Sequence, residues 1–212
     1  MKKYVLVSFI FLSAINALRA QDEEKGFKKE NLFTGGSVTV SFFNGQTLLG
    51  ADPMFGYKFA DWVDAGLAFN FLYNGARDYY EFNDRIRQTV YGPGIFTRLY
   101  PIKFLFVQGQ FEHNFSTLKY IPAAGSVSYI GDRVTTGANS LLIGGGFAQG
   151  REKGSNSFYY ISVMVDVLKN VNSPYVNVVY NPDNPSQQRI TMAPVIRAGL
   201  NIALFQGKNR YR

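Results

Sequence analysis

Residues 62–73 have the sequence WVDAGLAFNFLY, in which two kinds of side chain alternate. Every second position, counted from 63, is apolar: Val63, Ala65, Leu67, Phe69 and Phe71. The positions between them are small or polar: Asp64, Gly66, Ala68 and Asn70. A period of two is that of a β-strand, whose successive side chains point to opposite faces of a sheet. The stretch therefore predicts a strand in a sheet that has one apolar and one mixed face.

The same alternation recurs along the chain and is clearest at 105–112, 159–167 and 196–204. The sequence predicts eight strands, at about 36–43, 47–58, 62–73, 89–100, 104–114, 138–149, 157–167 and 191–204. Short connections (59–61, 101–103 and 150–156) alternate with long polar ones (74–88, 115–137 and 168–190). Short turns at one end and long loops at the other are typical of an up-and-down barrel. We therefore expect an all-β fold, an eight-stranded antiparallel up-and-down transmembrane β-barrel over residues 36–205.

The alternation alone leaves open which face lies inside. A soluble, lipocalin-like barrel turns its apolar face inward, whereas a membrane barrel turns that face to lipid. The mixed face favours the membrane arrangement, because glycines beside long charged side chains suit a narrow lumen. The charged residues expected in the lumen are Asp52, Lys58, Asp64, Arg98, Glu112, Asp166 and Arg197. Since an unpaired buried charge is costly, we expect them to form an internal ion-pair network.

Aromatic residues gather where the predicted strands meet the short connections. They include Tyr57, Phe59, Trp62, Tyr100, Phe104 and Tyr159. Amphipathic rings are enriched at the two interfaces of a membrane barrel, where one end of the ring is apolar and the other is hydrated. We expect these residues to form an interfacial aromatic girdle in contact with outer-membrane lipid.

The two ends of the chain differ in character from the strands. Lys2-Lys3, the apolar segment 4–15 and a small residue at Ala17 or Ala20 predict a secretory signal peptide over residues 1–20. Residues 21–35 are charged and lack periodicity, which predicts a periplasmic tether. Residues 206–212 form a short basic tail.

Composition narrows the classes of function. The formal net charge is +7, and removing Lys2, Lys3 and Arg19 leaves 19 basic and 15 acidic residues. This balance is too mild to predict nucleic-acid binding, and it is compatible with loops near anionic lipid head groups. The chain has no cysteine and one histidine, so we expect no disulfide, no thiol catalysis and no transition-metal site. No cofactor is expected.

Several segments resemble the small outer-membrane β-barrel families of Gram-negative bacteria, namely the OmpA-barrel, OmpX-like and PorT-like proteins. The segments are 62–69, 91–100 (YGPGIFTRLY), 104–111 and 141–147, the last with Gly144-Gly145-Gly146. The resemblance covers about residues 35–205. It implies an outer-membrane location with the N-terminus and short turns in the periplasm and the long loops outside the cell.

An eight-stranded lumen holds only side chains, so we expect no general diffusion pore. The function expected is structural or interaction-based: envelope integrity, adhesion, or an accessory subunit that contacts another envelope protein through loops 74–88, 115–137 and 168–190. Within these loops, segments such as 120–122 and 175–180 keep a strand-like character, which could extend the hairpins beyond the membrane.

Two alternatives remain open at this point. The first is a lipid-modifying enzyme using His113, the only histidine. Ser116 lies three residues further along the strand and points to the opposite face, so a serine or acid from a loop (Ser126, Ser128 or Asp132) would have to serve as partner. The second alternative is a soluble periplasmic, lipocalin-like ligand-binding barrel.

Overall fold

A computed structural model of the chain describes residues 26–43, 46–78, 82–126, 133–151, 157–181 and 184–205. The expected signal peptide, the first part of the tether, the basic tail and the loop residues Ser128 and Asp132 lie outside these ranges. A 3₁₀ turn η1 (Lys29–Asn31) is followed by ten strands: β1 (Leu32–Phe43), β2 (Gln46–Ala60), β3 (Val63–Arg77), β4 (Arg85–Ile102), β5 (Leu105–Ile121), β6 (Arg133–Gln149), β7 (Phe158–Asp166), β8 (Val176–Asn181), β9 (Asn184–Met192) and β10 (Val195–Ala203). Within the described ranges, no helix has the length and apolar character needed to cross a membrane.

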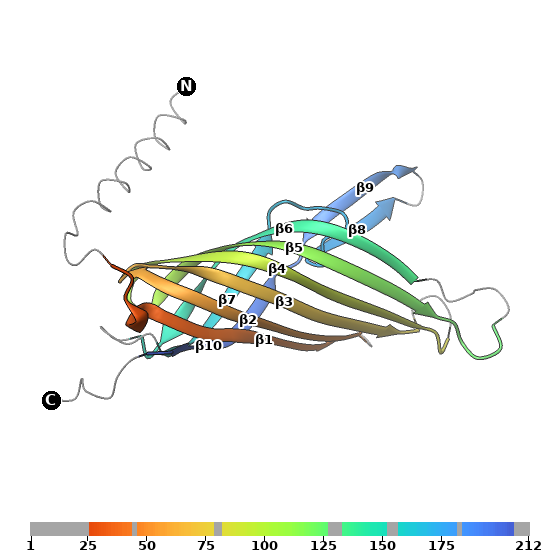
Figure 1. Cartoon of the computed structure of the whole chain (residues 1–212). Helices are drawn as coiled ribbons and strands as arrows, with labels where there is room; N and C mark the ends of the chain where they lie inside the picture. The colour runs from red at the N-terminus through yellow and green to blue at the C-terminus, as the bar shows by residue number, and fades with distance from the viewer. Residues whose placement is uncertain are drawn as a thin grey trace, which may run out of the picture.

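Eight of the strands close into an antiparallel barrel in the order β1-β10-β7-β6-β5-β4-β3-β2. Figure 1 shows a long cylinder, from the side of which the hairpin β8–β9 projects as a separate two-stranded sheet. Consecutive strands are neighbours throughout, apart from this inserted hairpin. The predicted all-β, eight-stranded up-and-down barrel is confirmed.

The apolar face of the alternation lies on the outside of the barrel. In β3, Leu67 is 62 % exposed whereas Ala68 is 7 % exposed. The same parity holds in β7 and β10, where Ile161 and Ile196 are exposed and Ser162 and Arg197 are buried. A lipocalin-like barrel requires the opposite arrangement, so the sheet has the polarity that the mixed face predicts.

The strands at the long-loop end are longer than the sequence predicts. β5 continues to Ile121 and β6 begins at Arg133, so Lys119 still pairs with Arg133. The hairpin β3–β4 likewise extends to the pair of Arg77 and Arg85. The side chains of these paired residues are charged, so the apolar alternation ends before the strands do. Backbone pairing continues the strands beyond the apolar part. At the other end β1 begins at Leu32, four residues before the expected position.

The seventh connection departs most from the expectation. It contains β8 and β9, and the last barrel strand begins at Val195 instead of 191. β8 and β9 form a sheet of their own, because they pair with each other from Val176↔Met192 to Asn181↔Asn184 and with no described barrel strand. Pro194 precedes β10, and a proline lacks the N–H that would continue a ladder.

The seam between β1 and β10 is closed over only part of its length. The two strands pair from Phe33↔Ala203 to Val38↔Ala198. Beyond Val38, β1 continues to Phe43 paired only with β2, and β10 continues back to Val195 paired only with β7. The barrel wall is therefore split at the loop-end half of this seam, next to the segment that connects β7 to β8.

Candidate functional site

The lumen near the short turns is filled by aromatic rings around a buried arginine. The Arg98 guanidinium lies 5.3, 5.2 and 4.1 Å from the ring centroids of Phe96, Phe106 and Tyr160. Its Nε donates to Gln108 Oε1 (2.7 Å), and its Nη1 donates to Asn201 Oδ1 (3.1 Å). Ring faces and amide oxygens thus stabilise this charge, because the ring quadrupole attracts a cation and amide oxygens accept its hydrogen bonds.

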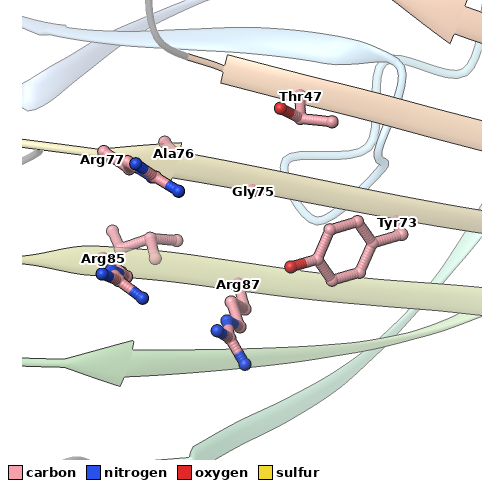
Figure 2. A pocket seen from close by; sticks show the side chains of 8 residues that line it. Thr47, Tyr73, Gly75, Ala76, Arg77, Arg85 and Arg87 are labelled. Carbon is pink, nitrogen blue, oxygen red and sulfur yellow. The ribbon is translucent and has the colours of Figure 1, made fainter.

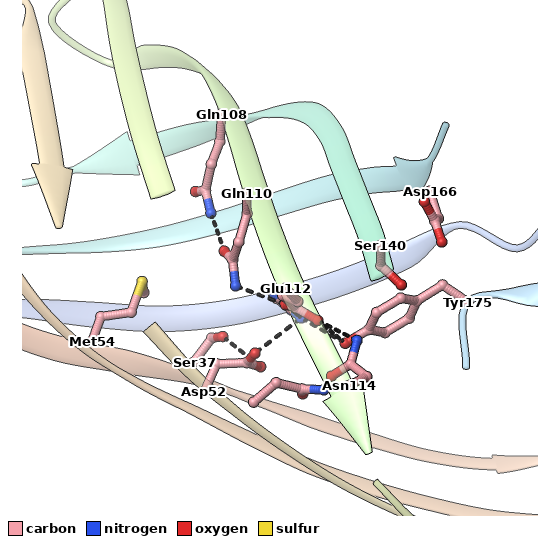
Figure 3. Close-up of polar contacts among 12 residues, drawn as sticks. Ser37, Asp52, Met54, Gln108, Gln110, Glu112, Asn114, Ser140, Asp166 and Tyr175 are labelled. Atoms are coloured by element: carbon pink, nitrogen blue, oxygen red, sulfur yellow. Dashed lines mark hydrogen bonds and ion pairs between the residues drawn. The ribbon is translucent and has the colours of Figure 1, made fainter. Parts of the chain in front are cut away.

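A ladder of hydrogen bonds runs along the inner face of β5 (Figure 3). Gln108 Nε2 donates to Gln110 Oε1 (2.7 Å), and Gln110 Nε2 donates to Glu112 Oε1 (2.8 Å). From the other side, Asn114 Nδ2 donates to Glu112 Oε2 (3.0 Å). Alternate residues of one strand face the same side, which is why four consecutive inward positions contact one another.

Glu112 is the centre of this ladder and accepts hydrogen bonds from four side chains. Besides Gln110 and Asn114, its carboxylate accepts from the Tyr175 hydroxyl (2.7 Å) and from Arg197 Nη2 (3.1 Å). Tyr175 lies outside the barrel strands, in the connection from β7 to β8. Burial, and then the adjacent Glu112 carboxylate, raise the pKa of the Tyr175 phenol well above its ordinary value. The phenol therefore keeps its proton and acts as a donor.

Arg197 of β10 joins two carboxylates from different strands, Asp52 of β2 and Glu112 of β5. Its Nη2 lies 2.9 Å from Asp52 Oδ1 and 3.1 Å from Glu112 Oε1, and all three residues are buried. Ser37 Oγ also donates to Asp52 Oδ2 at 3.4 Å. This cluster of Asp52, Glu112 and Arg197 is the part of the predicted ion-pair network that the structure brings together.

The other four predicted lumen charges, Lys58, Asp64, Arg98 and Asp166, are also buried, but they have other partners. Lys58 pairs with Asp61 at the short-turn end (2.7 Å), and Asp64 lies 3.7 Å from Arg151. Asp166 accepts hydrogen bonds from the backbone N–H of Leu141 and Leu168 and from the Ser173 hydroxyl. The reason is distance along the barrel: Asp52 and Lys58 are six residues apart on β2, or about 20 Å, which exceeds the reach of their side chains.

Several residues of the site were not predicted. Gln108, Gln110 and Asn114 have the same parity as Glu112, so the alternation of 104–114 contained the signal for them. Tyr175 and Arg151 lie in connections, and no periodic pattern in the sequence indicated that they enter the lumen.

The predicted girdle residues divide between the two faces. Phe59, Phe104 and Tyr159 are exposed on the outer face, and Trp62 is exposed in the turn between β2 and β3. Tyr57 is half-buried against Phe59, with ring centroids 5.1 Å apart. Tyr100 is inside the barrel, 4 % exposed, with the Arg151 guanidinium 3.6 Å from its ring centroid. Its assignment to the girdle is wrong, because Tyr100 has the parity of Arg98, which faces the lumen.

The split seam opens into a cavity of about 510 Å³. Its mouth is apolar and includes Val38, Pro174, Pro194 and Ile196, and its floor includes Asp52, Asn70 and Arg197. This volume lies within the range of small-molecule sites, roughly 300–1,000 Å³. Because the charges of Asp52 and Arg197 pair with each other, the floor is polar but leaves no unpaired cation to bind an anion.

The arrangement at His113 does not form a catalytic dyad with the neighbouring serine. His113 is exposed on the outer face, where its Nδ1 lies 2.6 Å from Asn139 Oδ1 and its ring contacts Phe115. Ser116 is buried on the inner face and accepts a hydrogen bond from Gln88. In the part of the chain that the structure describes, there is no group of three or more His, Cys, Asp or Glu side chains placed to hold a metal ion.

The sequence matches no protein-family model and no curated protein at a significant level. The resemblance to the small outer-membrane barrels therefore remains an expectation based on the segments quoted above.

Proposed function

We propose that the protein is a transmembrane barrel of the outer membrane with a structural or interaction role, and that its lumen is not a diffusion pore. The observation that carries this proposal is the polarity of the wall. Leu67, Ile95 and Val107 are among the large apolar side chains on the outside, while Arg98, Glu112 and Arg197 are buried inside. In a bilayer this apolar outer face would contact lipid chains. In aqueous solution the same face would stay exposed to water, which is unfavourable.

The filling of the lumen supports a role other than passive transport. Aromatic rings and Arg98 occupy the short-turn half, and the middle holds Glu112 with the Tyr175 and Arg197 side chains bonded to it. An eight-stranded barrel has only enough interior for side chains. The protein then acts through its surface, in lipid or toward other proteins.

The hairpin β8–β9 supports contact with another envelope protein. It projects beyond the barrel wall as a two-stranded sheet that pairs with no barrel strand (Figure 1). A projecting hairpin offers free strand edges, to which an extended segment of a partner adds by backbone hydrogen bonds. Loops 74–88 and 115–137, whose strands extend further than predicted, are additional candidates for such contact.

The experiment is fractionation of cells that produce the full chain, followed by gel migration with and without boiling. We expect the protein in the outer membrane, with a shift on boiling, and no stable conductance after reconstitution in planar bilayers. Recovery as a soluble periplasmic protein without a shift would contradict membrane insertion, and steady channels would contradict the closed lumen. Replacing residues 177–190 with a short Gly-Ser turn should leave the shift intact and abolish partner cross-linking; retained cross-linking would contradict the role of the hairpin.

The cavity at the split seam favours a second candidate function, the binding of one amphiphile. Its apolar mouth opens on the outer face beside Val38 and Ile196, and its polar floor is formed by Asp52 and Arg197. An acyl chain would fit the apolar mouth, and an uncharged head group that carries hydroxyls would fit the polar floor. A head that carries an unpaired negative charge would meet the Asp52 carboxylate.

Native mass spectrometry with a monoacylglycerol tests this function. We expect one bound molecule in the wild-type barrel and its loss in Ala193→Phe, which fills the cavity lining. Ile161→Phe, on the exposed face of β7, is the matched control and should retain the molecule. Equal retention in both variants would rule out the cavity as the binding site.

A further inference from the structure

The outer face of β3, β4, β5 and β6 changes in character from the barrel middle to the long-loop end. Cross-strand pairing aligns its residues in rows. The middle row is apolar: Leu67, Ile95, Phe111 and Leu141. The next rows toward the loops include an aromatic row (Phe71, Tyr91 and Phe115) and then a hydroxyl row (Tyr73, Thr89, Thr117 and Thr135). This sequence of rows, from apolar to aromatic to hydroxyl-bearing, is the one expected between the hydrocarbon core of a bilayer and its hydrated interface.

A cationic row follows the hydroxyl row. Arg87 of β4 pairs with Lys119 of β5, and Lys119 pairs with Arg133 of β6. One step further out, Arg77 of β3 pairs with Arg85 of β4. Like charges directly opposite one another on a sheet are destabilising unless an anion lies between or beside them. Among the residues the structure describes, none of these five basic side chains forms an ion pair with a carboxylate.

The acidic residues described at this end face other groups. The Asp78 carboxylate accepts a hydrogen bond from the backbone N–H of Asn83 at the hairpin tip (2.7 Å), and Asp84 is fully buried. Among the residues that the structure describes at this end, the outer surface therefore carries more positive than negative charge.

The arginines surround a small hollow over Gly75 (Figure 2). The hollow has a volume of about 160 Å³, and its lining includes Arg77, Arg85, Arg87 and the side chains of Thr47 and Tyr73. It exists because Gly75 has no side chain at a position where the neighbouring strand carries Arg87. Guanidinium groups and hydroxyls are the donors that a phosphate oxygen accepts from most strongly.

We infer that this hollow, named here the Gly75 niche, binds the phosphate of an anionic lipid head group in the leaflet at the long-loop end. Lys119 and Arg133 extend the attraction to neighbouring head groups along the same row. The inference rests on the proposed membrane insertion and adds to it a specific lipid partner.

Depth along the barrel agrees with this assignment. Gly75 is eight residues from Leu67 on β3, which is about 27 Å along the strand and roughly 20 Å along the barrel axis at a tilt of about 40°. With the apolar row of Leu67 at the bilayer centre, the niche lies at head-group depth, since half of a bilayer with its head groups is roughly 20–22 Å.

The test is electron spin resonance of the full-length barrel in phosphatidylcholine bilayers that contain either spin-labelled phosphatidic acid or spin-labelled phosphatidylcholine. Lipid that contacts an embedded barrel is motionally restricted. The ratio of the two restricted fractions measures the preference for the anionic phosphate monoester of phosphatidic acid over the zwitterionic phosphodiester of phosphatidylcholine. At low ionic strength we expect a preference of at least about fivefold for phosphatidic acid, and we expect salt to weaken it.

Two variants and one control separate the niche from general charge. Gly75→Val fills the niche without changing charge; the nearest atom to an added Cβ is the Tyr73 hydroxyl at 3.3 Å, at the end of a movable side chain. Arg77→Gln/Arg85→Gln/Arg87→Gln removes the cations of the niche. Lys28→Gln/Lys29→Gln/Lys103→Gln removes the same charge near the short-turn end. A shift on boiling verifies that each variant is folded.

We expect the preference to disappear in the arginine variant, to fall severalfold in Gly75→Val and to persist in the lysine control. Full preference in Gly75→Val would overturn the niche as the binding site, and equal loss in the lysine control would overturn site-specific binding. Restricted lipid without any preference in the wild type would overturn this inference alone. Absence of restricted lipid of either kind would overturn membrane insertion, and this inference with it.

Discussion

The Tyr175 hydroxyl donates a 2.7 Å hydrogen bond to the carboxylate of Glu112, in the middle of the lumen. Tyr175 belongs to the connection between β7 and β8, and Glu112 belongs to β5, which β7 and β6 separate from β10 in the barrel wall. The bond therefore ties the segment beside the split seam to the ladder that fills the interior. The cluster around Glu112 holds this irregular half of the barrel together.

Tyr175→Phe should lower the free energy of unfolding by about 1.5–3 kcal/mol, the contribution of a hydrogen bond to a charged acceptor. Urea titration of the barrel in detergent micelles measures it. Tyr159→Phe is the matched control, because the Tyr159 side chain is exposed on the outer face of β7, and its effect should stay within about 0.5 kcal/mol. Equal effects of the two substitutions would mean that the Tyr175 bond contributes nothing to stability.

Arg197→Met should be strongly destabilising, by about 3–5 kcal/mol, since it leaves the carboxylates of Asp52 and Glu112 buried without their cation. Adding Asp52→Asn and Glu112→Gln removes the uncompensated charges, so the triple variant should be more stable than Arg197→Met alone. Urea unfolding of the three proteins gives the comparison. A triple variant less stable than the single one would show that the pairing of charge is not what Arg197 contributes.

Gly144→Ala should destabilise the barrel by about 1–3 kcal/mol through overpacking. An added Cβ at Gly144 would collide with the backbone carbonyl of Val163 and with Met164 on the neighbouring strand. At Gly109, by contrast, no atom lies within 4 Å of an added Cβ, so Gly109→Ala should change stability by less than about 0.5 kcal/mol. The temperature of the boiling-dependent gel shift ranks the two variants, and equal midpoints would contradict the assigned contacts.

The barrel itself was predictable because its signal is periodic. Alternation at 62–73 and in the later strands identified both the strands and the face of each side chain. Gln108 and Gln110 lie four and two residues before Glu112 on one strand, so they face the same side of the sheet. Tyr100 shows the limit of aromatic composition as evidence. Its parity with Arg98 places it inside, although it stands next to a short connection like the exposed Phe104.

The arrangement of charges was less predictable, because it depends on height along the barrel and on side chains from connections. Arg151, which lies near Asp64, belongs to a short turn, and Tyr175 belongs to a long connection. The hairpin β8–β9 was also missed as an independent sheet. Local alternation at 175–180 suggested strand structure, but no sequence pattern indicates that two strands pair only with each other.

Spin labels on single cysteines report whether the outer face of the barrel contacts lipid. The chain has no cysteine of its own, so each label is unique. Ile95→Cys places the label in the middle apolar row, and Gly137→Cys places it in the aromatic row nearer the loops. In outer-membrane lipid bilayers, we predict that the Ile95 label collides mainly with oxygen, and that collisions with a water-soluble nickel chelate increase at Gly137. Free access of the nickel chelate to the Ile95 label in the folded, membrane-associated protein would contradict contact between the outer face and lipid.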